Sequence, residues 1–408
     1  MTTPIQELAR YYIRQFPNNT MAQQCFHGSP IEIDLAEVFT QIYCADLVTV
    51  RDSQLPAICV QVPVSDPEKW SAVAPILIDL IRFVSEDVLN ISFVKANPFC
   101  SAALFTEGCY DSVTLLSGGL DSYCGFSKNE IDHTKSVYMT FLQRGLVERG
   151  RQKTILTTVK THMNHYSRIQ SFQPLPVTRT THSQRTRALF FMALGVLTAG
   201  QFGAGEVLIY ENGPLSIHPR YFDRHVTKST HPKTIFLMNK ILSILGSSIR
   251  IRNPFFFKTK GEIVELLSAD LLSEAKETWS CGTSTQDSRW LEKQHKHCGY
   301  CSPCILRKMA FLAAGKACSD DAYFIPIDSS VRATMQHNIS PTVVSDYNSV
   351  LFYYQKYQNA IRTSSICNDW GLKNAYFPDS SWKDDTLNML RRFEMEIGGF
   401  WNSNGQIY

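Results

Sequence analysis

A short apolar run at residues 113–116 leads directly into a loop that contains two adjacent glycines, and this junction constrains the fold most strongly. The loop reads Ser117, Gly118, Gly119, Leu120, Asp121 and Ser122. Adjacent glycines let backbone N–H groups turn inward without a Cβ in the way, and the start of a following helix adds more unpaired N–H groups. The serine hydroxyls add donors, and the Asp121 carboxylate can hold a cation. The pattern therefore predicts a strand, a phosphate-binding loop and a helix; the alternative is an ordinary Gly-Gly turn with Asp121 or Ser122 capping the helix.

Two further apolar runs, at residues 137–141 and 207–210, are separated from the first by segments of helical length. This alternation predicts an α/β fold with a parallel sheet. Ligands of such sheets bind beyond the carboxyl ends of the strands. Ser117, Leu142 and Glu211 each follow a run, so we expect them to face one crevice.

The position of each residue relative to the strands predicts what it would contact in this crevice. The backbone of Thr140, Phe141 and Leu142 is expected to line a nucleotide bound in the crevice. Glu211 and Asn212 would face a second substrate, either an acceptor molecule or the edge of a purine-like compound. The alternative, that they are ordinary loop residues whose side chains cap backbone groups, is equally typical.

Arg185 and Arg187 open a helix whose apolar part, residues 188–200, is too short to span a membrane and is expected to be buried. Guanidinium groups are unfavourable at a helix start, so their presence indicates an anionic ligand. Arg187 and Lys260 are candidates to bind triphosphate or a substrate carboxylate. Structural salt bridges are the alternative.

Four cysteines have the spacing of a metal site: Cys281, Cys298, Cys301 and Cys304. Gly299 and Pro303 suit the tight turns that bring such thiolates to one tetrahedral zinc ion. Four sulfur ligands leave no open position, so the site would be structural. The alternatives are a redox pair or free buried cysteines, and His295 and His297 are close enough in sequence to replace a thiolate.

The two motifs together resemble a known family. Residues 117–122 resemble the pyrophosphate loop of the ATP pyrophosphatase superfamily, and no GxxxxGK string followed by Ser or Thr is present. With the cysteine pattern, residues 112–316 resemble the QueC family of 7-cyano-7-deazaguanine synthases. Segments 136–141, 258–264 and 278–281 add to the resemblance. It implies a PP-loop fold of the adenine nucleotide alpha hydrolase type. Enzymes with this fold cleave ATP between the α and β phosphates to form an adenylate.

These observations lead us to expect a defined set of functional residues and cofactors. The ATP site would comprise Leu116, Ser117, Gly118, Gly119, Leu120, Asp121, Ser122, Thr140, Phe141 and Leu142. Catalysis would involve Ser117, Asp121, Ser122, Arg187 and Lys260, and the substrate would contact Arg185, Arg187, Glu211, Asn212 and Lys260. The cofactors would be ATP, Mg²⁺ at the phosphates, and structural Zn²⁺ on the four cysteines.

The chain also departs from the family. The Gly-Val-Asn and Tyr-Pro-Asp-Cys-Arg segment that closes over the deazaguanine is replaced by residues 210–216 and 229–232, and roughly a hundred residues flank the resemblance on each side, enough for a small domain by the usual domain sizes. This pattern resembles the QueC-like proteins of the bacterial Qat anti-phage system. It implies adenylation of 7-carboxy-7-deazaguanine and acyl transfer to a protein amine, such as the N-terminus of a partner encoded in the same operon. The alternatives are an ordinary synthase that uses ammonia, and a non-catalytic nucleotide-binding scaffold.

Three domains are expected: an α+β accessory domain at 1–110, the PP-loop domain with the zinc site at 111–318, and a helical extension at 319–408. In the first, residues 5–16 and 70–84 are expected to be helical, the latter interrupted by Pro75, and 31–35 and 57–63 to be strands. In the last, 329–360 and 383–396 are expected to be helices with a mainly buried aromatic stripe.

Composition narrows the functional class. The net charge of +3 and the lack of a basic cluster argue against nucleic-acid binding. No signal peptide is evident at the N-terminus, and the twelve cysteines lack a disulfide-scaffold pattern, so a reducing, cytoplasmic location without a membrane is expected. A polar loop with His218, His225 and His231 is a candidate lid.

Overall fold

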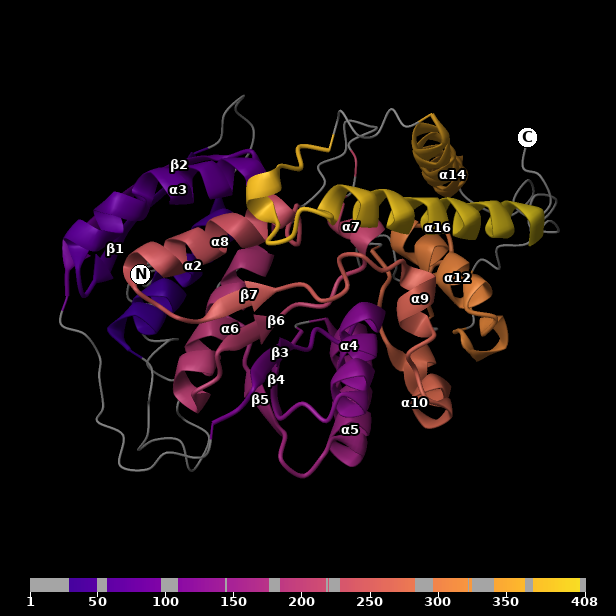
Figure 1. The fold of residues 1–408 in the computed structure, drawn as a ribbon, viewed down its shortest axis with the longest axis horizontal. Coiled ribbons are helices and arrows are strands. Elements are labelled where there is room, and N and C mark those ends of the chain that lie inside the picture. The colour runs from indigo at the N-terminus through magenta and orange to yellow at the C-terminus, as the bar shows by residue number, and fades with distance from the viewer. Residues whose placement is uncertain are drawn as a thin grey trace.

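The computed structural model describes residues 29–49, 57–96, 109–143, 145–175, 184–217, 219, 228–282, 296–321, 323–324, 341–363 and 370–403. Within these ranges the centre is a parallel five-stranded sheet in the order β5-β4-β3-β6-β7. Helices cover both of its faces, with α4 and α5 on one side and α6 on the other (Figure 1). The expected α/β class with a parallel sheet is confirmed.

The elements of this central unit follow the alternation expected from the sequence. Its strands are β3 (Ser112–Leu115), β4 (Ser136–Phe141), β5 (Arg168–Phe172), β6 (Glu206–Leu208) and β7 (Arg250–Arg252). Its helices are α4 (Leu120–Ile131), α5 (Leu146–His162), α6 (Arg187–Phe202), α7 (Gly213–Ile217), α8 (Pro232–Leu245), α9 (Lys260–Val264), α10 (Ala269–Glu274) and the 3-10 turn η2 (Ala275–Glu277). The three apolar runs correspond to β3, β4 and β6, and α6 is the expected buried helix.

The N-terminal region contains α2 (Pro30–Val48), β1 (Ala57–Val64), α3 (Pro67–Ser85) and β2 (Val88–Lys95), with β1 and β2 paired in parallel. The expected strand at 57–63 is confirmed as β1. The helix expected at 70–84 is α3, which continues through Pro75 on its exposed side, where water can bind the carbonyl that proline leaves unpaired. The helix expected at 5–16 lies outside the described residues.

The strand expected at residues 31–35 is wrong, because these residues belong to α2. Ser29 caps the helix and Pro30 takes its first position, a strong helix-start combination. The apparent polar alternation does not mark a solvent face, since the acidic side chains of α2 are buried with partners: Asp34 accepts a hydrogen bond of 2.8 Å from the backbone N–H of Ser65. A helix buried on nearly every side has no polar face for a periodicity argument to detect.

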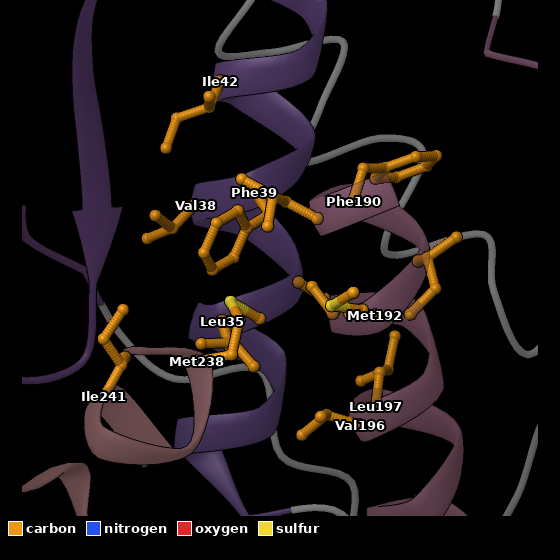
Figure 2. Packing of buried hydrophobic residues seen from close by; sticks show 14 of the residues in the cluster. Leu35, Val38, Phe39, Ile42, Phe190, Met192, Val196, Leu197, Met238 and Ile241 are labelled. Carbon is orange, nitrogen blue, oxygen red and sulfur yellow. The ribbon is translucent and has the colours of Figure 1, made fainter. Parts of the chain in front are cut away.

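The N-terminal region and the sheet share one hydrophobic cluster. Leu35, Val38 and Phe39 of α2 lie beside Phe190 and Met192 of α6 (Figure 2). Residues of α3, α8 and the sheet strands belong to the same cluster. The residues described before 110 are therefore packed as part of the central unit.

The C-terminal part contains α12 (Ser302–Ala313), η3 (Ala317–Ser319), α14 (Pro341–Arg362), η4 (Asn374–Tyr376) and α16 (Trp382–Ser403). The helix expected at 383–396 is confirmed, and the one expected at 329–360 is described only from residue 341. Tyr347, Tyr354 and Tyr357 are buried in a cluster that includes Cys298 and Cys304, so most of the aromatic stripe forms a core. In the part of the chain that the structure describes, no helix is both long and apolar enough to cross a membrane.

Candidate functional site

The loop between β3 and α4 is closed by hydrogen bonds among its own residues. The Oγ atoms of Ser117 and Ser122 lie 3.0 Å apart, and the backbone N–H of Gly119 donates to Ser117 Oγ at 3.2 Å. Gly118 has a φ of +85°, a conformation that favours glycine. The helix α4 begins without a side-chain cap, so neither Asp121 nor Ser122 plays the capping role that was the alternative.

Gln152 of α5 joins this loop to the end of β4, and no motif in the sequence marks it as a site residue. Its Nε2 donates to Thr140 Oγ1 and to the Phe141 carbonyl, both at 3.0 Å, while its Oε1 accepts from the backbone N–H of Gln143 at 3.0 Å. A Cβ on Gly118 would lie 3.2 Å from Gln152 Cγ. The side chain is only 2% exposed, so a buried amide fixes the spacing between the loop and the segment expected to line the nucleotide.

The remaining residues of the expected ATP site contribute mainly backbone. The side chains of Leu116 and Leu120 are buried in a hydrophobic cluster, and the ring of Phe141 packs against Phe190 and Phe191. The backbone N–H of Leu142 donates to the Phe172 carbonyl at 2.9 Å. These residues therefore shape the carboxyl edge of the sheet through their main chain.

Asp121 is the centre of a buried polar cluster at the same edge. It forms an ion pair with Lys260, the first residue of α9, and accepts hydrogen bonds from the backbone N–H and Nδ2 of Asn212 at 3.1 and 2.7 Å. Asn212 Nδ2 also donates to Glu211 Oε1 at 3.1 Å. Four residues that we singled out from three separate segments thus lie together.

The two carboxyl groups of the cluster, those of Asp121 and Glu211, have pKa values shifted in opposite directions. Burial raises the pKa of Asp121, but the charge of Lys260 and hydrogen bonds from Glu211, Lys260 and Asn212 bring it down to about 2. Burial and the adjacent Asp121 carboxylate hold the pKa of Glu211 well above its usual range. The charge of Lys260 therefore favours the ionised form of Asp121, while burial beside that carboxylate favours the protonated form of Glu211.

Mg²⁺ was expected at Asp121, and the surroundings of this carboxylate do not suit direct ligation. One oxygen is paired with Lys260 and the other accepts both hydrogen bonds from Asn212. Magnesium requires carboxylate oxygens that are free to complete a near-octahedral shell. In this arrangement Asp121 positions Lys260 and Asn212 instead.

The two arginines at the start of α6 have different surroundings. Arg185 Nη1 donates to the carbonyl of Ser85 at 2.8 Å, at the end of α3. Arg187 lies with its guanidinium carbon 5.0 Å from the ring centre of Phe191, which in turn contacts Phe141 at the end of β4. Arg187 is thus beside the carboxyl edge of the sheet, whereas Arg185 links α6 to the N-terminal region.

The four predicted cysteines meet. All four Sγ atoms of Cys281, Cys298, Cys301 and Cys304 lie within 4.8 Å of one another. The separations are 4.0 Å for Cys281 and Cys301 and 3.7 Å for Cys298 and Cys304. Tetrahedral zinc with bonds of about 2.3 Å separates its sulfurs by about 3.8 Å, so the cluster fits zinc with no position left for water.

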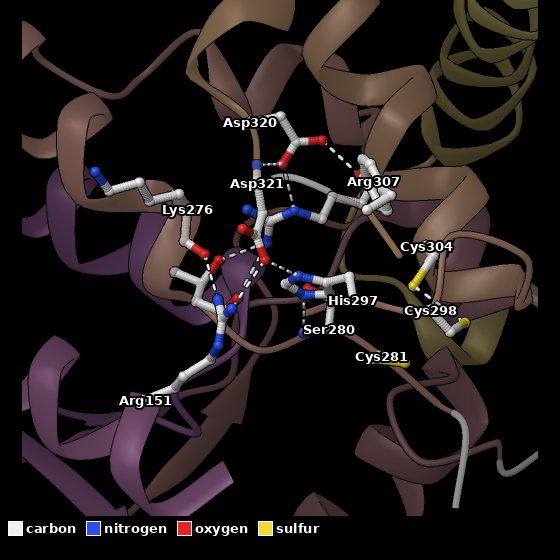
Figure 3. A network of polar contacts seen from close by, with 12 residues as sticks. Arg151, Lys276, Ser280, Cys281, His297, Cys298, Cys304, Arg307, Asp320 and Asp321 are labelled. Atoms are coloured by element: carbon white, nitrogen blue, oxygen red, sulfur yellow. Dashed lines mark hydrogen bonds and ion pairs between the residues drawn. The ribbon is translucent and has the colours of Figure 1, made fainter. Parts of the chain in front are cut away.

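His297 is not a metal ligand in this arrangement, because both ring nitrogens are engaged elsewhere. Nε2 accepts from the backbone N–H of Ser280 at 3.2 Å, and Nδ1 lies 2.7 Å from Asp321 Oδ2 (Figure 3). His295, the other substitute, lies outside the described residues. Of the candidate lid, His218 and His225 also lie outside them, and His231 caps α8 with its pKa lowered to about 4 by burial.

A network of buried and partly buried charges connects the cysteine cluster to the loop. Arg307 of α12 pairs with Asp320 at 2.6 Å, and Asp321 pairs with Arg151 of α5 at 3.0 Å (Figure 3). Trp279, two residues before Cys281, stacks on the His297 ring at 4.8 Å and lies under Arg151 at 5.1 Å. Its backbone N–H donates to the Gly118 carbonyl at 2.9 Å, so the segment that ends in the cysteine cluster also braces the loop.

Comparison with known proteins agrees with part of this site. The family model described as Queuosine biosynthesis protein QueC matches residues 185–315, about a third of the chain. The range contains Glu211, Asn212, Lys260 and all four cysteines, while the loop at 117–122 precedes it. No curated protein matches the chain. The match supports a QueC-like protein, and the parallel sheet with its flanking helices is consistent with a PP-loop fold.

Proposed function

We propose that the protein uses ATP to activate the carboxylate of 7-carboxy-7-deazaguanine and then transfers the acyl group to an amine. The observation that carries this proposal is the convergence at one sheet edge of the loop at 117–122, the Asp121 and Lys260 pair, and Glu211 with Asn212. The QueC match independently favours chemistry on a 7-deazaguanine, with ATP as the second substrate.

The first step is adenylation. A carboxylate oxygen of the substrate attacks the α phosphorus of ATP, the bond from that phosphorus to the bridging oxygen of the β phosphate breaks, and pyrophosphate leaves. The loop residues Ser117 and Ser122 would hold the phosphates through hydroxyl and backbone donors. Lys260 and Arg187 would stabilise the negative charge that develops on the α phosphate.

The second step is acyl transfer. The amine nitrogen attacks the acyl carbon, the bond to the phosphate oxygen breaks, AMP leaves and the amine loses a proton. Glu211, whose pKa is raised by burial and by the adjacent Asp121, and Asn212 would bind the polar edge of the deazaguanine. Zinc on the four cysteines would have a structural role, because no coordination position remains open.

The identity of the amine that accepts the acyl group distinguishes a protein-modifying enzyme from an ordinary synthase. We infer a protein amine, such as the N-terminus of a partner encoded in the same operon, and a cytoplasmic role in bacterial anti-phage defence. Long segments outside the QueC match, on both sides of it, support an acceptor larger than ammonia. Residues before 110 and after 340 pack directly against the central elements, so they offer extra surface close to the site.

To test this, the purified protein is mixed with ATP, Mg²⁺ and 7-carboxy-7-deazaguanine. The release of AMP and the mass of the intact proteins are then measured. Ammonium is added in one arm and the protein encoded next door in another. A mass gain on the neighbour equal to one deazaguanine amide supports protein modification. A small-molecule nitrile without such a gain identifies an ordinary synthase, and nucleotide binding without AMP from either arm identifies a non-catalytic scaffold.

Variants connect this assay to the site. Lys260→Met is expected to abolish AMP release, whereas Lys128→Met, at an exposed ion pair on α4, should retain it. If the operon protects against phage, plaque assays with the Lys260→Met variant should lose that protection. Equal AMP release by both variants would contradict the assignment of the site.

A further inference from the structure

The C-terminal helix α16 lies against two of the three segments that form the Asp121 cluster, those that contain Asn212 and Lys260. Met389, Arg392 and Glu396 recur along α16 at intervals of three and four residues, which places them on one side of a helix. Met389 touches the segment that follows Asn212, because a Cβ on Gly213 would lie 2.6 Å from Met389 Cε. The other two contact the turn that presents Lys260.

Glu396 contacts the residues on both sides of Lys260. Its Oε1 accepts a hydrogen bond from the Thr259 hydroxyl, and the backbone of Gly261 hydrogen-bonds to the same carboxyl group. The approach is close, since a Cβ on Gly261 would lie 2.4 Å from Glu396 Oε1. A single carboxyl group from the C-terminal helix thus holds both neighbours of the lysine that pairs with Asp121.

Arg392 supports the same turn from one helical turn earlier. Its Nε donates to Glu262 Oε1 at 2.6 Å and its Nη2 donates to the Phe257 carbonyl at 2.9 Å. Glu262 in turn accepts from the backbone N–H of Thr259 at 2.7 Å in the capping box that starts α9. The conformation of α9 is therefore determined partly by side chains of α16.

The burial of Glu396 indicates a role other than filling space. Its Oε2 is buried without a hydrogen-bond partner among the described residues. A buried polar atom without a partner costs stability, and an apolar side chain would fill this position at lower cost. The carboxyl group gains its contacts to the Lys260 turn in return.

We propose that Glu396 is a positioning residue for Lys260 and that α16 is part of the nucleotide site. The helix lies beyond residue 315, where the QueC match ends. The inference rests on the proposed function only in assuming that Lys260 acts on a nucleotide. The effect of Glu396 on the turn that contains Lys260 can be measured without any substrate.

The first measurement is the rate at which an amine-acylating reagent modifies Lys260, followed by peptide mass spectrometry. Lys260 is buried, so the intact protein should react slowly there. Glu396→Ala should raise this rate about fivefold to tenfold, the factor that corresponds to losing one hydrogen bond. Glu396→Gln should restore most of the protection, because its amide oxygen can accept the same hydrogen bonds. Met395→Ala, on the exposed neighbour of Glu396, is the matched control and should leave the rate unchanged.

Lys233 reports whether the whole protein has loosened, because it pairs with Asp79 on α3, outside the Lys260 turn. Faster modification of Lys260 alone supports the proposal, and an unchanged Lys260 rate or an equal rise at Lys233 overturns it. ATP affinity is measured on the same variants. Wild-type protein that protects Lys260 but binds no ATP would refute the proposed function while leaving the positioning role intact. ATP binding that is insensitive to Glu396→Ala despite faster modification would refute the nucleotide part of this inference alone.

Discussion

The backbone N–H of Trp279 donates a hydrogen bond to the carbonyl oxygen of Gly118 at 2.9 Å, which joins the segment leading to Cys281 directly to the loop after β3. The indole of Trp279 is held by His297 and Arg151, so this contact belongs to a well-packed region. The cysteine cluster is therefore connected to the loop through the short segment 279–281.

Loss of the metal is expected to weaken nucleotide binding as well as stability. Cys281→Ala or treatment with a chelator should lower the melting temperature and reduce ATP affinity about tenfold, because Trp279 would lose its fixed position. Metal content by elemental analysis and ATP titration by calorimetry measure the two effects. Cys318→Ala, at an exposed cysteine outside the cluster, should change neither. Metal-free protein that binds ATP normally would show that the two sites are independent.

Gly118→Ala is expected to destabilise the protein by about 1–2 kcal/mol, the cost of placing a non-glycine residue in the left-handed region. The added Cβ would also press on Gln152. Gly150→Ala is the matched control, because it lies within α5 with nothing within 4 Å of its Cβ and should stabilise the protein by up to about 1 kcal/mol. Urea unfolding of both variants measures the difference. Equal stabilities for the two would show that the loop does not need a glycine at this position.

Lys260→Met is expected to reduce the free energy of unfolding by about 3–5 kcal/mol, since it leaves the Asp121 carboxylate buried without its cation. Lys128→Met removes an exposed ion pair with Asp132 and should cost less than about 1 kcal/mol. The double variant Lys260→Met with Asp121→Asn should recover part of the loss. Chemical denaturation of all three distinguishes a buried pair from an exposed one, and a small effect of Lys260→Met would contradict the buried pair.

The stability of the protein should depend on the protonation of Glu396. Burial raises its pKa to about 8, with Glu262 of α9 and Glu265 just after that helix adding to the rise and hydrogen bonds from Thr259 and Gly261 opposing it. A raised folded pKa means that the folded state binds the proton more tightly, so this contribution to stability is fully present below the unfolded pKa of about 4.5. It is lost as the pH rises towards about 8, at no more than about 1.4 kcal/mol per pH unit.

Glu396→Gln removes that titration while Arg392, the nearby cation on α16, remains. The free energy of unfolding of the variant should therefore fall less than that of the wild type between about pH 5 and about pH 8. Urea unfolding across this range measures the difference between the two profiles. Parallel profiles would show that Glu396 has the same pKa in the folded and unfolded protein.

Features that depend on neighbouring residues in the chain could be predicted from the sequence. The loop at 117–122 and the turn between Cys298 and Cys304 are local patterns, and both have the expected form. Gln152 could not be predicted, because an isolated glutamine in an amphipathic helix is normally a surface residue, and only the approach of α5 to β4 buries it. Glu396 acts on a turn more than a hundred residues earlier, which no local pattern records. The pattern at residues 31–35 wrongly predicted a strand, because acidic side chains that look solvent-facing in the sequence have hydrogen-bond partners in the interior.

The packing of α2 against α6 has a consequence for how the chain matures. The side chain of Asp46 accepts hydrogen bonds from the N–H and hydroxyl of Thr186, both at 2.9 Å, so α2 reaches its native surroundings through a residue 140 positions later. During synthesis the apolar surface of α2 leaves the ribosome well before α6 exists to cover it. The nascent protein is thus exposed to aggregation for the time needed to translate that interval. Slowing translation there or withdrawing chaperones should lower the yield of folded protein before either affects the mature form.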